Sequence, residues 1–263
     1  MGITVRDLRA FRERGERFIM LTAYDYPTAN ILDAAGVPVI LVGDSLAQTV
    51  LGYETTLPVT MEEMLHHTRA VARGARNALI VGDMPFLSYQ TSVEDGIRNA
   101  GRFLKEGGAH AVKLEGAAFD LATALVDRGI PVMAHLGLTP QSVNAMGGYR
   151  VQGRTETDAL RLMDEAQGME KSGAFAIVLE GVPADLAGQI TETVTVPTIG
   201  IGAGPDCSAQ VLVLTDLLGL NSGRYPKFAK PYADLRGEIT RAVEAFRTDV
   251  ETGAFPDAEH SYR

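Results

Sequence analysis

The sequence predicts an α/β fold, a (β/α)8 barrel, from two observations. Apolar runs recur eight times along the 263 residues, at intervals of roughly 20 to 45 residues, and helical patterns separate most of them. Four of these runs also end in an acid, as expected when strand ends converge on one mouth. No composition shift or flexible linker divides the chain. We therefore expect one barrel domain over residues 1–263, including a C-terminal helix and tail.

An open, doubly wound sheet is the alternative fold. Such a sheet would place its acids on two neighbouring strands at a switch point. Here the acids end the second, third, fourth and sixth runs, which favours the barrel.

The expected strands are short apolar runs bounded by turn or helix signals. They cover residues 18–24, 37–44, 78–83, 109–116, 130–138, 175–180, 196–203 and 211–220. Asp216 and Gly219 interrupt the last run, so it fits a strand less well than the others.

The expected helices begin or end at recognisable residues. Thr60 and Glu63 have capping-box spacing, and Gly107 with Gly108 ends the helix that starts near Val93. The helices cover residues 27–36, 60–76, 93–106, 120–128, 156–172, 183–193 and 233–252. Two long loops, residues 45–58 and 138–155, are candidates to close over a substrate.

Composition excludes several classes of protein. Apolar residues make up 46% of the chain, and the formal net charge is −9 without a Lys/Arg-rich block, which argues against nucleic acid as the main partner. No run of roughly 18 uncharged apolar residues and no N-terminal leader is visible, so we expect a cytoplasmic protein without a membrane span. The lone cysteine, Cys207, excludes a disulfide framework and a Cys-rich zinc site.

We expect the chemistry at the strand ends. Four acids close apolar runs: Asp44, Asp83, Glu115 and Glu180. Lys113 shares the face of Glu115 in the stretch AHAVKLEG, because residues i and i+2 of a strand point the same way. Converging carboxylates repel each other unless a cation or protons intervene, and Mg²⁺ prefers oxygen ligands. Each acid alone could simply cap the next helix, but the four together favour a cation site.

Other residues have weaker signals. His135 ends the fifth run, where it could ligate a metal, bind substrate or hydrogen-bond a carbonyl group. The glycines of GIGAG, residues 200–204, resemble a phosphate-binding turn but also suit any tight turn. We expect packing or surface roles for His66, His67, His110 and Cys207.

These residues stand in stretches that resemble the ketopantoate hydroxymethyltransferase (3-methyl-2-oxobutanoate hydroxymethyltransferase) family. The matching stretches cover nearly the whole chain in order: MLTAYDYPTA, VGDSL, TLPVT, HLGLTPQSV, GGYRVQGRT, PTIGIGAG, PKFAK and TGAFPDAEHSYR. That family is similar to the phosphoenolpyruvate/pyruvate-type TIM barrels, which handle 2-oxo acids with Mg²⁺. The resemblance implies transfer of a hydroxymethyl group from 5,10-methylenetetrahydrofolate to 3-methyl-2-oxobutanoate. The product would be 2-dehydropantoate, for pantothenate biosynthesis, formed through an enolate that Mg²⁺ stabilises.

The resemblance also implies roles for individual residues. Asp44 and Asp83 match acids that bind the metal and contact the substrate, and Glu115 matches an acid at the metal, directly or through a water. The remaining matches are substrate contacts at Ser45 and Lys113, a site residue near the substrate at His135, and the general base at Glu180.

The family resemblance further implies a homo-oligomer, with a decamer as the form it suggests. The final helix has apolar residues at helical spacing, which would join subunits or pack on its own barrel.

Two other functions remain as alternatives. A Mg-dependent 2-oxo-acid carbon–carbon lyase would usually carry a reactive cysteine in a lid, and neither long loop contains one. A non-catalytic barrel that binds a phosphate ligand at GIGAG would leave the four strand-end acids without a purpose.

Overall fold

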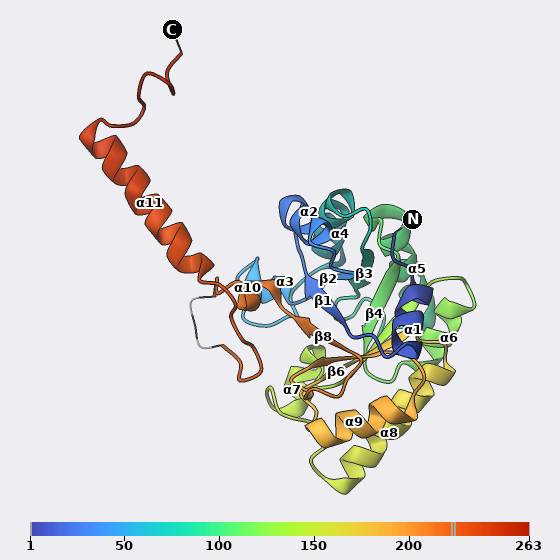
Figure 1. The fold of residues 1–263 in the computed structure, drawn as a ribbon. Helices are drawn as coiled ribbons and strands as arrows, with labels where there is room; N and C mark the ends of the chain where they lie inside the picture. The colour runs from blue at the N-terminus through green and yellow to red at the C-terminus, as the bar shows by residue number, and fades with distance from the viewer. Residues whose placement is uncertain (1, 222, 224, 263) are drawn as a thin grey trace. The chain divides into compact units, whose positions relative to one another are not determined.

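The computed structural model describes residues 2–221, 223 and 225–262, and these contain a closed barrel of eight parallel strands in sequence order (Figure 1). The strands are β1 Phe18–Thr22, β2 Val39–Val42, β3 Leu79–Asp83, β4 Ala111–Glu115, β5 Val132–Gly137, β6 Ala176–Glu180, β7 Thr198–Ile201 and β8 Ala209–Leu212. The predicted barrel is confirmed, and the open-sheet alternative is wrong. Contacts along the chain define two units, residues 1–213 and residues 214–263. The single domain over residues 1–263 stays a prediction.

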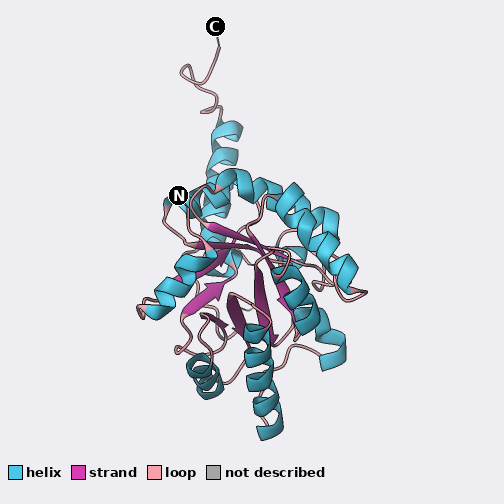
Figure 2. Cartoon of the chain, turned by 90° about the vertical axis from the view of Figure 1, so that its right-hand side faces the viewer, coloured by secondary structure: helices cyan, strands magenta, loops and turns pink. Residues whose placement is uncertain are grey.

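Helices surround the strands of the first unit (Figure 2). They are α1 Val5–Glu13, α2 Tyr26–Ala34, α3 Leu46–Thr49, α4 Met61–Gly74, α5 Val93–Arg102, α6 Phe119–Val126, α7 Val143–Met146, α8 Glu156–Lys171 and α9 Ala184–Thr193. A π-helical turn, Phe103–Gly107, continues α5, and a 3-10 turn, Pro140–Ser142, precedes α7. The capping box at Thr60 is present, since Glu63 N donates to Thr60 Oγ1 at 3.2 Å and Thr60 N donates to Glu63 Oε2 at 2.8 Å.

Three local predictions need correction. Helix α1 was not expected, because its apolar residues are few and its surface is highly charged. The eighth strand starts at Ala209 and ends at Leu212, so the predicted run 211–220 is mostly wrong; the short helix α10, Leu214–Leu217, follows it. Both long loops also contain a short helix, α3 and α7. Periodicity is too weak over four residues to reveal such turns.

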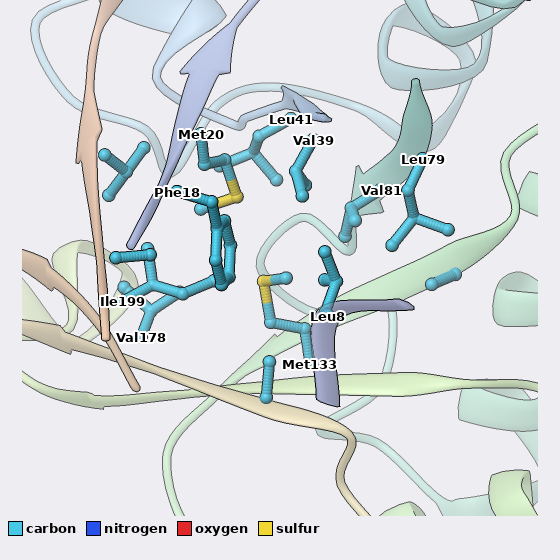
Figure 3. Packing of buried hydrophobic residues seen from close by; sticks show 14 of the residues in the cluster. Leu8, Phe18, Met20, Val39, Leu41, Leu79, Val81, Met133, Val178 and Ile199 are labelled. Carbon is cyan, nitrogen blue, oxygen red and sulfur yellow. The ribbon is translucent and has the colours of Figure 1, made fainter. Parts of the chain in front are cut away.

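Alternate residues of each strand fill the barrel. The buried cluster contains Phe18 and Met20 from β1 and Val39 and Leu41 from β2 (Figure 3). Each of the strands β3 to β8 adds one or two further residues. Leu8 projects from α1 into the same cluster and is fully buried. A barrel of eight strands is narrow enough for such side chains to fill it, so the interior is a packed core and not a channel.

Close packing also explains one glycine of the barrel wall. A Cβ atom at Gly82 in β3 would lie 2.3 Å from Cδ1 of Phe103. Phe103 begins the π-helical turn and is fully buried, so it has no room to move away. Because Gly82 has no side chain, the ring of Phe103 packs directly against β3, the strand that carries Asp83.

The second unit contains α10 and the long helix α11, Leu235–Thr252. Asp234 caps α11, because its side chain accepts a hydrogen bond from Gly237 N at 3.1 Å. The chain before α11 is tied to α10 by a bond from Tyr232 N to Leu217 O at 2.8 Å. No described residue of α11 is buried, and the apolar residues Ile239, Val243, Phe246 and Val250 are exposed. Among the described residues, no helix is long and apolar enough to cross a membrane.

We predict that Leu8→Ala lowers the free energy of unfolding by about 2–5 kcal/mol, because it opens a cavity at a fully buried position. Leu160→Ala on α8 is the matched control: this leucine is 58% exposed, and its loss should change stability by about 0.5 kcal/mol or less. Urea unfolding of both variants measures the difference. Equal effects would show that α1 does not complete the core.

Candidate active site

Polar side chains continue the interior rows of the barrel at the C-terminal ends of the strands. They are Asp83 after Val81, Lys113 and Glu115 after Ala111, His135 after Met133, and Glu180 after Val178. Each lies two residues beyond an apolar interior residue, or four in the case of Glu115, so it points to the same side of its strand. The strand register makes several of them direct neighbours: Asp83 pairs with Lys113, and Glu115 pairs with His135. The sequence-predicted residues on β3 to β6 are thereby brought together.

Lys113 lies at the centre of this cluster. Its Nζ atom is 2.8 Å from Asp83 Oδ1 and 4.0 Å from Glu115 Oε1, and all three side chains are buried. Burial by itself would lower the pKa of Lys113, but the carboxylates of Asp83, Glu115 and Asp44 outweigh it and raise the pKa above the usual value. The side chain is therefore a buried ammonium group that holds the acids together.

His135 joins two acids across the strand ends. Its Nδ1 atom lies 3.4 Å from Glu115 Oε1, and its Nε2 atom lies 3.2 Å from Glu180 Oε2. Burial and Lys113 act to lower the pKa of His135, yet the two carboxylates raise it to about 9. Lys113 Nζ is also only 3.1 Å from Nδ1. A raised pKa corresponds to a charged ring that donates to both Glu115 and Glu180, and the nearby ammonium group of Lys113 opposes that charge.

Asp44 lies two residues beyond β2 and joins the cluster through its backbone and its side chain. Asp44 N donates to Asp83 Oδ2 at 3.0 Å, and Asp44 Oδ2 accepts from Gln141 Nε2 at 3.0 Å. Burial, then the negative charges of Asp83 and Glu115, raise the pKa of Asp44 well above its usual value. Burial likewise raises the pKa of Asp83, against the opposing charge of Lys113. Both acids are thus held close together at a real electrostatic penalty.

Glu115 differs from the two aspartates. Burial would raise its pKa, but the bond to His135 and the charges of His135 and Lys113 lower it. Gln141 N also donates to Glu115 Oε2 at 2.9 Å. Glu115 is therefore the acid whose ionised form the surrounding protein stabilises best.

Ser45 is half-buried beside Asp44. The Ser45 hydroxyl lies 2.9 Å from the hydroxyl of Tyr24, a buried residue just after β1. Tyr24 O in turn lies 2.6 Å from His67 Nδ1, which explains His67 as a packing residue. His110 also has a structural partner, since its Nδ1 accepts from Ile80 N at 3.0 Å. Cys207 is buried, as expected.

The donor set suits a hard divalent cation. Asp83 Oδ1 and Glu115 Oε1 are buried carboxylate oxygens that lie 2.8 and 4.0 Å from the ammonium group of Lys113, and Glu115 Oε1 also lies 3.4 Å from His135 Nδ1. Such oxygens are the atoms that Mg²⁺ binds, commonly one or two carboxylates completed by waters and substrate oxygens. Among the described residues, no three His, Cys, Asp or Glu side chains are arranged to hold one ion by themselves.

Three residues of the site were not found from the sequence. Gln141 follows β5 and contacts both Asp44 and Glu115, and Tyr89 follows β3 and bonds Gln141. Tyr24 orders Ser45. The only signal for Gln141 was its place in the second long loop, because loop residues have no periodicity from which burial could be inferred.

Comparison with known proteins identifies a matching family and several close relatives of the chain. The family model described as ketopantoate hydroxymethyltransferase matches residues 2–258. A 3-methyl-2-oxobutanoate hydroxymethyltransferase from Moorella thermoacetica is 57% identical over 263 residues, covering 99% of this chain and 98% of that protein. One from Dehalococcoides mccartyi is 54% identical, covering 100% of this chain and 94% of the relative.

Solved structures of lower identity share the fold. A phosphonopyruvate hydrolase in complex with oxalate and Mg²⁺ superposes with a TM-score of 0.63 at 15% identity, covering 98% of this chain and 93% of that one. The 2,3-dimethylmalate lyase, a member of the PEP mutase/isocitrate lyase superfamily, has a TM-score of 0.61 at 17% identity, with 99% and 92% covered. The barrel is therefore of the type found in that superfamily.

We predict that Lys113→Met destabilises the metal-free protein by about 3–5 kcal/mol at pH 8, because it leaves buried carboxylates without their counter-charge. The loss should shrink towards pH 5. Asp44 and Asp83 have raised pKa values, so they favour folding where they are protonated and oppose it as the pH rises. Urea unfolding in a chelator at both pH values tests this, with the exposed Lys171→Met as control. An equal loss at pH 5 and pH 8 would contradict the electrostatic account.

Proposed function

Because the chain belongs to the ketopantoate hydroxymethyltransferase family, we propose that it transfers a hydroxymethyl group to 3-methyl-2-oxobutanoate and forms 2-dehydropantoate, with 5,10-methylenetetrahydrofolate as donor. The chain is an enzyme of the hydroxymethyltransferase class, and that class requires a one-carbon donor. The observation that carries the proposal is the buried cluster of Asp44, Asp83, Lys113 and Glu115 at the barrel mouth. Formally, carbon 3 of the substrate loses a proton and bonds to the methylene carbon of the donor, and one water supplies the new hydroxyl group. The two nitrogens of the released tetrahydrofolate take up the carbon-3 proton and the remaining proton of the water.

Asp44 and Asp83 would hold a Mg²⁺ ion, with Glu115 beside it, directly or through a water. When bound, this ion would stabilise the negative charge that develops on the 2-oxo acid and orient its oxygens. The burial of Asp83 and the hydrogen bond from Asp44 N to Asp83 Oδ2, which brings the two acids together, support this assignment. The electrostatic penalty on the two aspartates also supports it, since a cation would relieve their repulsion.

Lys113, Ser45 and His135 would contact the substrate. Lys113 is positioned by Asp83 and offers positive charge to an anionic group. Ser45 has its hydroxyl oriented by Tyr24, so it can donate to a carboxylate oxygen. His135 faces Glu180 with Nε2 and would keep that acid pointed at the mouth.

Glu180 would act as the general base. Its side chain is 18% exposed, against 3% or less for Asp83 and Glu115, so it alone among these acids reaches the open mouth. It has no ion pair with Lys113 among the contacts of the described residues, and its neighbour is His135. A base must reach the proton without being a tight metal ligand, which leaves Glu180 as the suitable acid.

We also propose that the chain forms a homo-oligomer in which α11 contacts a second copy. Ile239, Val243, Phe246 and Val250 repeat at intervals of four, three and four residues, and all four are about half exposed. This spacing makes one apolar stripe, which a second chain would cover.

The metal assignment predicts that Asp44→Asn and Asp83→Asn abolish detectable Mg²⁺ binding in calorimetry. Glu115→Gln should weaken binding less, by about 10- to 100-fold, if a water lies between Glu115 and the ion. Asp164→Asn on α8 is exposed and serves as control. Full activity of both aspartate variants, or of the wild type in excess chelator, would rule out the metal site.

The base assignment predicts proton exchange without the donor. In D₂O, with Mg²⁺ and 3-methyl-2-oxobutanoate alone, the wild type should exchange the carbon-3 proton, which NMR detects. Glu180→Gln should lose this exchange yet retain Mg²⁺ binding, because the amide keeps the shape but cannot accept the proton. The exposed Glu192→Gln should exchange like the wild type. Exchange at an unchanged rate in Glu180→Gln would move the role to another residue.

The oligomer prediction is tested by light scattering at micromolar concentration. The wild type should be larger than a monomer, and Phe246→Glu should reduce its mass because a charge enters the apolar stripe. The control is Ile31→Glu, because the side chain of Ile31 on α2 is exposed; this variant should not change the mass. A monomeric wild type would contradict the assembly.

A further inference from the structure

Gln141 is a buried residue whose side-chain amide and backbone N–H group all make hydrogen bonds. It is 5% exposed and lies in the 3-10 turn Pro140–Ser142, just beyond β5. Its side-chain nitrogen Nε2 donates to Asp44 Oδ2 at 3.0 Å and to Met84 O at 2.9 Å. Its backbone N–H donates to Glu115 Oε2 at 2.9 Å. One residue therefore binds two of the acids proposed to surround the metal.

The orientation of the Gln141 amide is determined by its neighbours. Met84 O is a backbone carbonyl and can only accept, so Nε2 must be the atom that faces it. The opposite atom, Oε1, then lies 2.9 Å from the Tyr89 hydroxyl and 3.0 Å from Gln90 Nε2, both of which can donate. The atom that faces Asp44 is therefore a donor without a charge.

Tyr89 connects the same group to β4. Its hydroxyl oxygen accepts from Glu115 N at 3.0 Å, and its proton lies between Gln141 Oε1 and Glu115 O at 2.9 and 3.2 Å. Tyr89 is buried, so the loop after β3 and the loop after β5 are joined by a water-excluded network. Gln141 and Tyr89 thus hold the ends of β2, β3 and β4 in one arrangement.

An uncharged donor is the group that Asp44 needs at this position. A second cation beside it would compete with a metal for the carboxylate, and an apolar residue would leave Asp44 Oδ2 without a partner. The amide satisfies one oxygen of Asp44 and fixes the plane of the carboxylate while adding no charge. It contacts neither His135 nor Glu180 in the hydrogen bonds of the described residues.

We propose that Gln141 is a positioning residue, supported by Tyr89, that orients Asp44 and Glu115 for the cation before substrate arrives. This inference rests on the proposed function, because it assumes that these acids surround a metal. Gln141 does not touch the reacting atoms. Its effect on the reaction passes through the two carboxylates that it holds.

The test compares Gln141→Met with Thr191→Val. Methionine keeps the length of the side chain but removes the amide, whereas Thr191 is an equally buried polar residue on α9, bonded to Thr198 and remote from the acids. Three quantities are measured for each variant: the dissociation constant of Mn²⁺ in the absence of substrate, kcat and KM, and the midpoint of urea unfolding. Gln141→Met should weaken Mn²⁺ binding by about 10- to 100-fold and lower kcat. Thr191→Val should lower only the unfolding midpoint.

A double-mutant cycle distinguishes positioning from general support. If Gln141 and Tyr89 act as one unit, adding Tyr89→Phe to Gln141→Met should lower kcat/KM by less than Tyr89→Phe does alone. Thr191→Val added to Gln141→Met should leave kcat/KM at the value of Gln141→Met alone. Wild-type Mn²⁺ affinity and kcat in Gln141→Met would overturn the inference, as would equal losses in Thr191→Val.

A crystal structure of metal-free Gln141→Met separates this inference from the proposed function. Displacement of the Asp44 carboxylate in that structure would support the positioning role even if the wild type had no transferase activity. An unchanged Asp44 in that structure would overturn the positioning role, whereas an inactive wild type would overturn only the proposed function.

Discussion

The ammonium group of Lys113 is the interaction on which the rest of the site depends. It stands 2.8 Å from Asp83, 4.0 Å from Glu115 and 3.1 Å from His135, in a region that water does not reach. Without it, buried carboxylates at this separation would protonate or move apart. With it, the pKa values of Asp44 and Asp83 are still raised, because burial and the neighbouring negative charges oppose their ionisation. Binding of a further cation near these carboxylates would therefore reduce the repulsion between them.

The barrel makes this arrangement possible because its strand register is rigid. Asp83 pairs with Lys113 and Glu115 pairs with His135, so these groups are neighbours across the sheet independently of the loop conformations. Below them, the interior is filled by apolar side chains and sealed by Leu8 from α1. A filled core resists the small shifts that would separate the groups. The site thus gains its precision from strands, while the residues that complete it come from loops.

The loop residues differ in kind from the strand residues. Strands β3 to β6 supply charged groups and His135, whereas the loops after β1, β3 and β5 supply Tyr24, Tyr89 and Gln141. These three side chains carry hydroxyl or amide groups, and each bonds to a residue proposed to touch metal or substrate. Neutral donors of this type orient a carboxylate or a serine without changing the charge of the site. Because the charged groups come from strands and the neutral donors from loops, a substitution in a loop can shift the position of a carboxylate without changing the charge around Lys113.

The sequence by itself determined the barrel and the acids at its mouth. Short apolar runs bounded by turn or helix signals predict buried strands. Because residues i and i+2 of a strand point the same way, Lys113 and Glu115 are placed on one face without further information. The family resemblance then assigned expected roles to the strand-end residues. Tertiary structure alone decided which loop residues reach the acids, since the bonds from Gln141 to Asp44 and Glu115 span 97 and 26 positions of the chain. It also decided that α1 closes the core and that β8 ends at Leu212, followed by the helix Leu214–Leu217. Such contacts depend on which distant segments become neighbours in the fold, and local sequence periodicity contains no information about that.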